Sequence, residues 1–115
     1  MHEASLAGSV LQLVEEAARR EGFVRVVALR LEAGRLAGVN VHALRFALDS
    51  LAPGTLLAGA RIHVDEPAGR AWCTPCGREV DLDQRGDACP VCGGYQLRPT
   101  GGTALRIIDL QVSDD

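Results

Sequence analysis

Four cysteines in two closely spaced pairs constrain this chain more than any other feature of its sequence. The pairs are Cys73-Thr74-Pro75-Cys76 and Cys89-Pro90-Val91-Cys92, with 12 residues between them and a glycine after each. A C-x2-C turn directs two sulfur atoms at one centre, and two such turns that face each other form a tetrahedral cage of four thiolates. The spacing therefore predicts a closed, structural zinc site held by Cys73, Cys76, Cys89 and Cys92.

Other uses of these cysteines fit the sequence less well, and one of them stays open. Two disulfide bonds would require an oxidising compartment, and the N-terminus lacks the basic and apolar segments of a secreted chain. A redox-active C-x2-C belongs on a thioredoxin-like βαβ pattern, which this sequence does not have. An iron atom in a rubredoxin-like cage remains an alternative, because the Cys-Pro-Val-Cys-Gly turn suits either metal.

The residues outside this module alternate between helical and extended patterns. Apolar residues recur at helical spacing over residues 4–21 and again over 41–51, where Asn40 is a suitable N-cap. β-Branched and alternating apolar runs predict strands over residues 24–31, 60–66 and 103–112. We therefore expect an α+β fold in which two helices pack on a small mixed three-stranded sheet, with a zinc-ribbon-like module inserted before the last strand. The expected domains are a discontinuous α/β core of residues 1–69 and 98–115, and a metal-binding module of residues 70–97.

Charge and composition argue against several classes of function. The chain has 12 basic and 15 acidic side chains, a net charge of −3, which argues against a protein built to bind nucleic acid. No apolar run is long enough to cross a bilayer, and no Ser-His-Asp set, phosphate-binding loop or spaced carboxylate pair stands out. We therefore expect a cytoplasmic, non-enzymatic protein that binds neither membranes nor nucleic acid. A zinc-ribbon adaptor that binds protein or nucleic acid, without a labile metal, stays open as an alternative.

The N-terminal residues Met1, His2 and Glu3 form a second candidate site. A histidine at position two lies one residue from the α-amine of the chain. The amine, the His2 amide and the His2 ring nitrogen can form adjacent chelate rings, and such a nitrogen set suits the square-planar preference of Ni(II) or Cu(II). On the residues alone, a solvated terminus is the more ordinary interpretation. We also expect His42 to be exposed and His63 to be exposed or half-buried, neither of them a metal ligand.

Several of these motifs together resemble the HypA/HybF family of nickel metallochaperones, which act in nickel–iron hydrogenase maturation. The resemblance extends over essentially the whole chain. Its features are the opening Met1-His2-Glu3, Ser5, the C-x2-C…C-P-x-C-G module, the final strand, and the stretches Leu36-Ala37-Gly38-Val39, 43–48 and Gly54-Thr55.

This resemblance implies that Ni(II) binds through the Met1 amine, the His2 ring and neighbouring backbone amides, with Glu3 adjoining. It implies structural zinc at the four cysteines and Ni(II) as a transiently bound cargo. The implied partners are the nickel-insertion GTPase and the large subunit of the nickel–iron hydrogenase, and some members of the family also serve urease. In some members an aspartate before the second helix assists at the nickel site, whereas this chain has Asn40, which offers no carboxylate.

Overall fold

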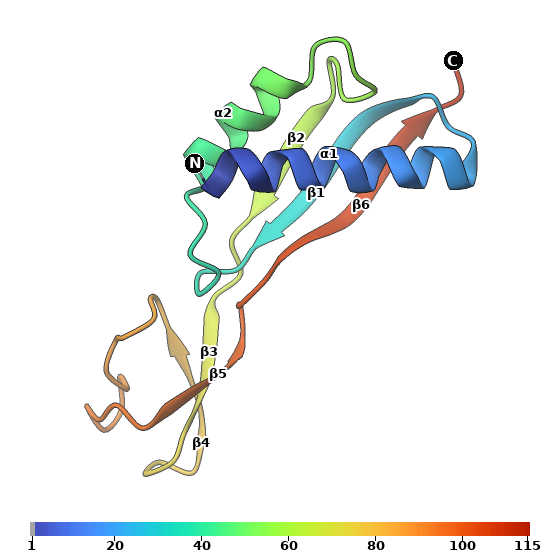
Figure 1. The fold of residues 1–115 in the computed structure, drawn as a ribbon. Coiled ribbons are helices and arrows are strands. Elements are labelled where there is room, and N and C mark those ends of the chain that lie inside the picture. Colours follow the sequence, from blue (N-terminus) through green and yellow to red (C-terminus); the bar gives the residue numbers. More distant parts are fainter. Residues whose placement is uncertain (1) are drawn as a thin grey trace. The chain divides into compact units, whose positions relative to one another are not determined.

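The computed structural model of the chain describes residues 2–115 (Figure 1). Its elements, in order, are α1 (His2–Glu21), β1 (Arg25–Ala33), α2 (Val41–Leu51), β2 (Arg61–Asp65), β3 (Gly69–Cys73), β4 (Arg78–Leu82), β5 (Leu97–Gly101) and β6 (Leu105–Ser113). The strands form two sheets of three, in the orders β2-β1-β6 and β4-β3-β5. The predicted α+β fold with two helices is confirmed. No helix within residues 2–115 is long and apolar enough to cross a bilayer.

The sheet that contains β1 is mixed, as predicted. Figure 1 shows the arrows of β1 and β2 pointing the same way and the arrow of β6 pointing the opposite way. A parallel pair of strands needs a crossover connection, and α2, which lies between β1 and β2 in the sequence, supplies it. The central strand β1 is therefore parallel to one neighbour and antiparallel to the other.

Each helix buries one apolar face. α1 buries Ala7, Val10 and Val14, which recur at helical spacing, and α2 buries Leu44 and Leu48. Full burial of a valine or leucine side chain is worth about 1.5–3 kcal/mol. In folded proteins most helical stability comes from packing of an apolar face, so these buried faces contribute most of the stability of the two helices.

The chain divides into two compact units. The first consists of the segments that end at Leu31, run over Asn40–Val64, and run over Ile107–Asp115. The second consists of Glu32–Val39 and Asp65–Arg106. The loop after β1 thus belongs to the second unit, although the helix that follows it belongs to the first. The sequence predicted two domains, a discontinuous core of residues 1–69 and 98–115 and a module of residues 70–97. That division stays a prediction.

The second unit is built on the antiparallel sheet β4-β3-β5. Its central strand β3 alternates in burial, with Ala71 and Cys73 buried and Trp72 between them 38% exposed. Leu36, from the loop after β1, is buried against Ala71 and Leu82. A loop residue therefore supplies one of the few large aliphatic side chains in this core.

The three strands of the second unit were not predicted from the sequence, which indicated only a cysteine module in this part of the chain. Each of these strands has five residues. The buried positions of β3 are taken by glycine, alanine and cysteine rather than by the β-branched residues that mark a strand. β5 contains Pro99, which is tolerated because β5 lies at the edge of its sheet.

Two backbone segments of the second unit pass so close at Gly34 and Gly102 that neither residue has room for a side chain. A Cβ atom at Gly34 would lie 2.2 Å from the carbonyl oxygen of Gly102. We expect Gly34→Ala to destabilise the protein by about 1–3 kcal/mol, the usual cost of overpacking a rigid site. Urea unfolding followed by the fluorescence of Trp72 measures this change.

Gly8→Ala is the matched control for that substitution. A Cβ atom at Gly8 meets nothing within 4 Å, and Gly8 lies in the interior of α1. This change should stabilise the protein by about 0.5–1 kcal/mol, because glycine is unfavourable inside a helix. If Gly34→Ala were as stable as the wild type, the close passage of the two segments would be wrong.

Candidate metal centre

The four cysteines converge on one point in the second unit. Cys73 ends β3, Cys76 follows in the turn before β4, and Cys89 and Cys92 lie in the loop before β5. Their sulfur atoms lie within 4.8 Å of one another, with Sγ–Sγ separations of 3.6 Å for Cys73–Cys92 and 3.9 Å for Cys76–Cys89. A tetrahedral site with zinc–sulfur bonds of about 2.3 Å places its sulfurs about 3.8 Å apart. The separations therefore fit a metal cage, and none of the four cysteines is in a disulfide bond.

Each pair of cysteines lies in the same kind of turn. The N–H of Gly77 donates to the carbonyl of Cys73, and the N–H of Gly93 donates to the carbonyl of Cys89, both at 2.9 Å. Gly77 and Gly93 have φ angles of 63° and 75°, which residues with a side chain rarely adopt. The glycine that follows each pair in the sequence is thus required by the geometry of the turn.

Hydrogen bonds set the proton affinity of these thiols. The backbone N–H groups of Cys92 and Val91 lower the pKa of Cys89 to about 6, so this sulfur is a thiolate at neutral pH. The hydrogen bond with Cys73, together with burial, raises the pKa of Cys76 to about 12. Cys89 is therefore ready to bind a metal ion, and metal binding displaces the protons of the other thiols.

Burial differs from one side of the cage to the other. Cys73 and Cys89 are buried and pack in one cluster with Val80, whereas Cys92 is exposed. Four thiolates fill every position of a tetrahedral metal and leave none open for a substrate or an acceptor. The arrangement suits a metal ion that holds the fold together rather than one that is passed on.

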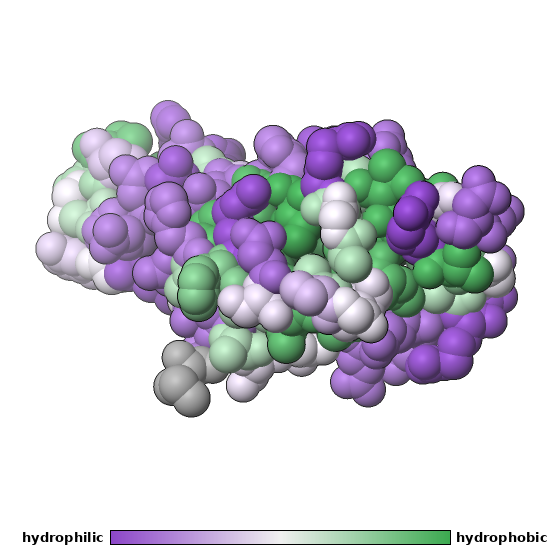
Figure 2. Space-filling view, turned by 90° about the horizontal axis from the view of Figure 1, so that it is seen from above, coloured by the Kyte–Doolittle hydropathy of each residue, from purple (hydrophilic) through white to green (hydrophobic). Residues whose placement is uncertain are grey.

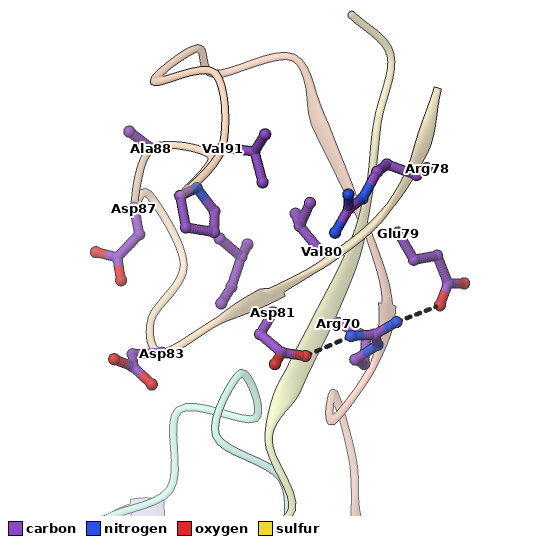
Figure 3. Close-up of a pocket in the computed structure, with 11 residues that line it drawn as sticks. Arg70, Arg78, Glu79, Val80, Asp81, Asp83, Asp87, Ala88 and Val91 are labelled. Carbon is purple, nitrogen blue, oxygen red and sulfur yellow. Dashed lines mark hydrogen bonds and ion pairs between the residues drawn. The ribbon is translucent and has the colours of Figure 1, made fainter. Parts of the chain in front are cut away.

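A hollow of about 440 Å³ lies beside β4 and the second cysteine loop (Figure 3). Its lining combines apolar side chains, among them Val80 and Val91, with charged ones. Arg70 donates to Asp81 and, at 3.3 Å, to Glu79, as the dashed lines in Figure 3 show. Four carboxylates and two guanidinium groups line the hollow. This excess of negative charge disfavours a phosphate or a nucleic acid as its ligand.

The described part of the N-terminal candidate site consists of His2 and Glu3, in the first turn of α1. The side chain of His2 is 66% exposed, and its Nδ1 lies 3.9 Å from Oε2 of Glu3. The side chain of Glu3 is only 17% exposed, and the same Oε2 accepts a 3.0 Å hydrogen bond from the backbone N–H of Asn40. That bond lowers the pKa of Glu3 from its usual value, so the group stays a carboxylate. Met1, the remaining predicted ligand, lies outside the described residues.

Asn40 caps α2, as its sequence position predicted. Its φ is −81°, and its side-chain oxygen accepts a 3.0 Å hydrogen bond from the N–H of Ala43. The sequence did not predict the bond from its backbone N–H to Glu3, which lies 37 residues away. A backbone N–H group is present at almost every residue, so no sequence motif shows which one donates to a distant side chain. The capping pattern marks Asn40 as the start of α2 but does not identify its partner.

The other two histidines are exposed, as expected. His42 lies in the first turn of α2, and His63 lies in β2. Within residues 2–115, the four cysteines are the one group of three or more side chains placed to hold a metal ion. The structure therefore brings together the predicted zinc ligands, and in the described part of the chain it brings neither His42 nor His63 into a metal site.

A second hollow, of about 330 Å³, borders Glu3 and is largely apolar. Its apolar lining comes from α1 and α2 and consists of Ala4, Ala43, Phe46, Ala47 and Leu51. Phe46 is 74% exposed, and Figure 2 shows apolar side chains reaching the surface in several patches among polar ones. The first turn of α1 thus borders the kind of apolar surface that is found at protein contacts.

Comparison with known sequences identifies close relatives along the whole chain. A family model described as "Hydrogenase/urease nickel incorporation, metallochaperone, hypA" matches residues 1–112. The hydrogenase maturation factor HypA of Polaromonas naphthalenivorans is 62% identical over 115 residues, which cover 100% of both chains. The hydrogenase maturation factor HypA of Cupriavidus necator is 60% identical over 114 residues, which cover 99% of this chain and 96% of the other.

Two solved structures have a similar fold. The solution structure of the Ni metallochaperone HypA from Helicobacter pylori matches with a TM-score of 0.70 at 16% identity, covering 98% of each chain. A second solution structure of a HypA protein matches with a TM-score of 0.66 at 18% identity, covering 100% of this chain and 98% of the other. At these levels of identity the likeness shows the fold alone.

Proposed function

Because the chain belongs to the HypA family of hydrogenase/urease nickel-incorporation metallochaperones, we propose that it binds Ni(II) at its N-terminus and delivers it for nickel–iron hydrogenase maturation. The proposed ligands are the α-amine of Met1 and the ring and amide nitrogens of His2, with Glu3 adjoining. The four cysteines hold a structural zinc ion. In this proposal the protein carries a metal ion and catalyses no reaction.

The exposure of His2 is the observation that carries this proposal. A metal ion that is to be delivered needs few ligands and must be open to the acceptor. His2 is 66% exposed at the beginning of α1 and is next to the terminal residue in the sequence. The thiolate cage, in contrast, has two buried cysteines and no open coordination position. Each site therefore has the character that its proposed metal requires.

Delivery requires that the ligands of nickel are exchanged one after another. Nitrogen ligands from two adjacent residues leave the remaining coordination positions to water or to groups of the acceptor. An acceptor can thus bind the nickel ion before the amine and the imidazole dissociate from it. The apolar hollow beside Glu3 lies next to the place where such an acceptor would approach.

The aromatic residues near the cage favour zinc over iron. A rubredoxin-like iron site usually has an aromatic cluster around it. Here the two nearby aromatic residues, Trp72 and Tyr95, are 38% and 73% exposed. Neither side chain is buried over the sulfur atoms, so the site has the character of a structural zinc site.

The proposed partners are those of nickel insertion. They are a nickel-insertion GTPase and the large subunit of the nickel–iron hydrogenase, both in the cytoplasm, with the urease maturation machinery as a further acceptor. Support comes from the family, whose description names both hydrogenase and urease, and from the two relatives named as hydrogenase maturation factors.

Metal analysis of protein purified without a tag tests the proposal. We expect one tightly held zinc ion per chain and the uptake of one added Ni(II). His2→Ala should abolish the nickel uptake, whereas His42→Ala, a matched exposed histidine on the other helix, should leave it unchanged. Stoichiometric iron would replace the zinc assignment. A wild-type protein that takes up no nickel would overturn the nickel site and favour an adaptor role.

A further inference from the structure

We infer that Glu3 is a positioning residue for the N-terminal nickel site, and that its carboxylate is bound to the backbone of Asn40 rather than to the metal. This inference rests on the proposed function, because it assigns a role within the proposed site. It divides the three N-terminal residues into two kinds: Met1 and His2 supply nitrogen ligands, and Glu3 holds them in place.

The Glu3 carboxylate already has a partner in the protein. Its Oε2 accepts the 3.0 Å hydrogen bond from the N–H of Asn40, and its side chain is far less exposed than that of His2. A carboxylate at the start of a helix is also stabilised by the positive end of the helix dipole, here that of α2. To become a nickel ligand, this oxygen would have to share or give up its bond.

Asn40 is a well-fixed point of attachment. Its side-chain oxygen accepts from the N–H of Ala43 at 3.0 Å, and its carbonyl accepts from the N–H of Leu44 at 2.9 Å. The side chain of Leu44 is fully buried. Because the N–H of Asn40 donates to Glu3, the first turn of α1 is tied directly to the first turn of α2.

This attachment matters because the proposed nickel ligands lie at a helix end. The first turn of a helix lacks intrahelical partners for its N–H groups, and chain termini fray readily. Glu3 directly follows His2, so fixing Glu3 restricts the positions of the His2 amide and ring. Oε2 of Glu3 lies 3.9 Å from Nδ1 of His2, which is too far for a hydrogen bond but near enough for the carboxylate to attract a metal cation bound at His2.

Two substitutions at Glu3 separate positioning from direct ligation. Glu3→Gln keeps an oxygen that can accept the N–H of Asn40 but removes the charged carboxylate that nickel would bind. Glu3→Ala removes the oxygen altogether. On zinc-loaded, untagged protein, we expect calorimetry to give a nickel affinity within about threefold of wild type for Glu3→Gln and a loss of about 10–100-fold for Glu3→Ala. Glu21→Ala, at the exposed far end of α1, is the control and should bind normally.

Asn40 allows the same test from the donor side. Asn40→Pro removes the backbone N–H, and the φ of −81° at this position suits a proline ring. Asn40→Ala is its matched control, because both variants lose the side-chain cap and only the proline variant loses the N–H. We expect Asn40→Pro to weaken nickel binding as much as Glu3→Ala, by about 10–100-fold, and Asn40→Ala to bind within about threefold of wild type. Circular dichroism checks that each variant is folded.

Hydrogen exchange of the amide of residue 40 gives a readout that needs no nickel. This amide should be protected in the wild type, in Glu3→Gln and in His2→Ala, and should exchange freely in Glu3→Ala. An equal loss of nickel affinity in Glu3→Gln and Glu3→Ala, with normal binding by Asn40→Pro, would overturn the inference and make the carboxylate a ligand. Normal nickel binding by His2→Ala would instead overturn the proposed site, while the exchange data would still report on the bond between Glu3 and Asn40.

Discussion

A four-residue extension in front of Met1 should weaken Ni(II) binding by more than about a hundredfold. That is more than the loss of about 10–100-fold expected when a residue that only supports the metal ligands is changed. The extension moves the α-amine away from His2 and breaks the chelate that joins them, which leaves a single exposed imidazole. One added residue is too short for this test. It would place the histidine third in the chain, where the amine, two amides and the ring form a new planar nitrogen set.

Calorimetry with Ni(II) on the native and extended proteins measures this loss, and zinc content is the internal control. Zinc should be unchanged, because the cysteine cage lies about 70 residues away along the chain and is closed on itself. His2→Ala should bind as weakly as the extended protein, whereas His63→Ala should bind as the wild type does. If the extended protein held nickel as tightly as the native one, the amine would not be a ligand.

Cys76→Ala should release the zinc ion and unfold the second unit. In small metal modules the free energy of metal binding, about 10–16 kcal/mol for zinc-finger peptides, is largely folding free energy. The apolar core of this unit is too small to replace that contribution, since it consists mainly of Leu36, Ala71, Val80 and Leu82. The two helices have apolar faces of their own and should keep their far-ultraviolet circular dichroism.

Thr74→Ala is the matched control, because Thr74 lies in the same turn and is exposed. It should keep its zinc and its native spectrum. Zinc content by metal analysis and the fluorescence of Trp72, which lies in β3, distinguish the two variants. Full zinc occupancy and native fluorescence in Cys76→Ala would show that the four-cysteine assignment is wrong.

The helices could be predicted from the sequence because the information that defines them is local. The apolar spacing and the cap at Asn40 predicted a helix over 41–51, and α2 has those bounds. The strands of the first sheet were predicted to within about two residues at each end, since β-branched and alternating apolar residues mark them in the sequence. The strands of the second unit were missed, because each has only five residues, the buried positions of β3 hold glycine, alanine and cysteine, and β5 contains Pro99.

The two candidate sites also differ in how far they depend on local sequence. The spacing of the cysteines fixes the geometry of each turn, so the sequence alone predicted which four side chains converge. The contact of Glu3 with Asn40 joins residues 37 positions apart through a backbone donor. The burial of Leu36, a loop residue, against Ala71 is equally non-local. Neither contact has a motif, and both depend on how the chain folds back on itself.

The close passage at Gly34 and Gly102 has a genetic consequence. The atoms that a side chain at Gly34 would strike are all backbone atoms of Gly102, and those that a side chain at Gly102 would strike are backbone atoms of Ala68 and Gly69. Backbone atoms are present whatever residue the codon specifies, so no change of a neighbouring side chain can make room. Suppressors of Gly34→Ala should therefore be revertants to glycine or stabilising changes elsewhere in the chain, such as Gly8→Ala, and not substitutions of neighbouring side chains, whereas defects in the apolar core can be compensated by repacking.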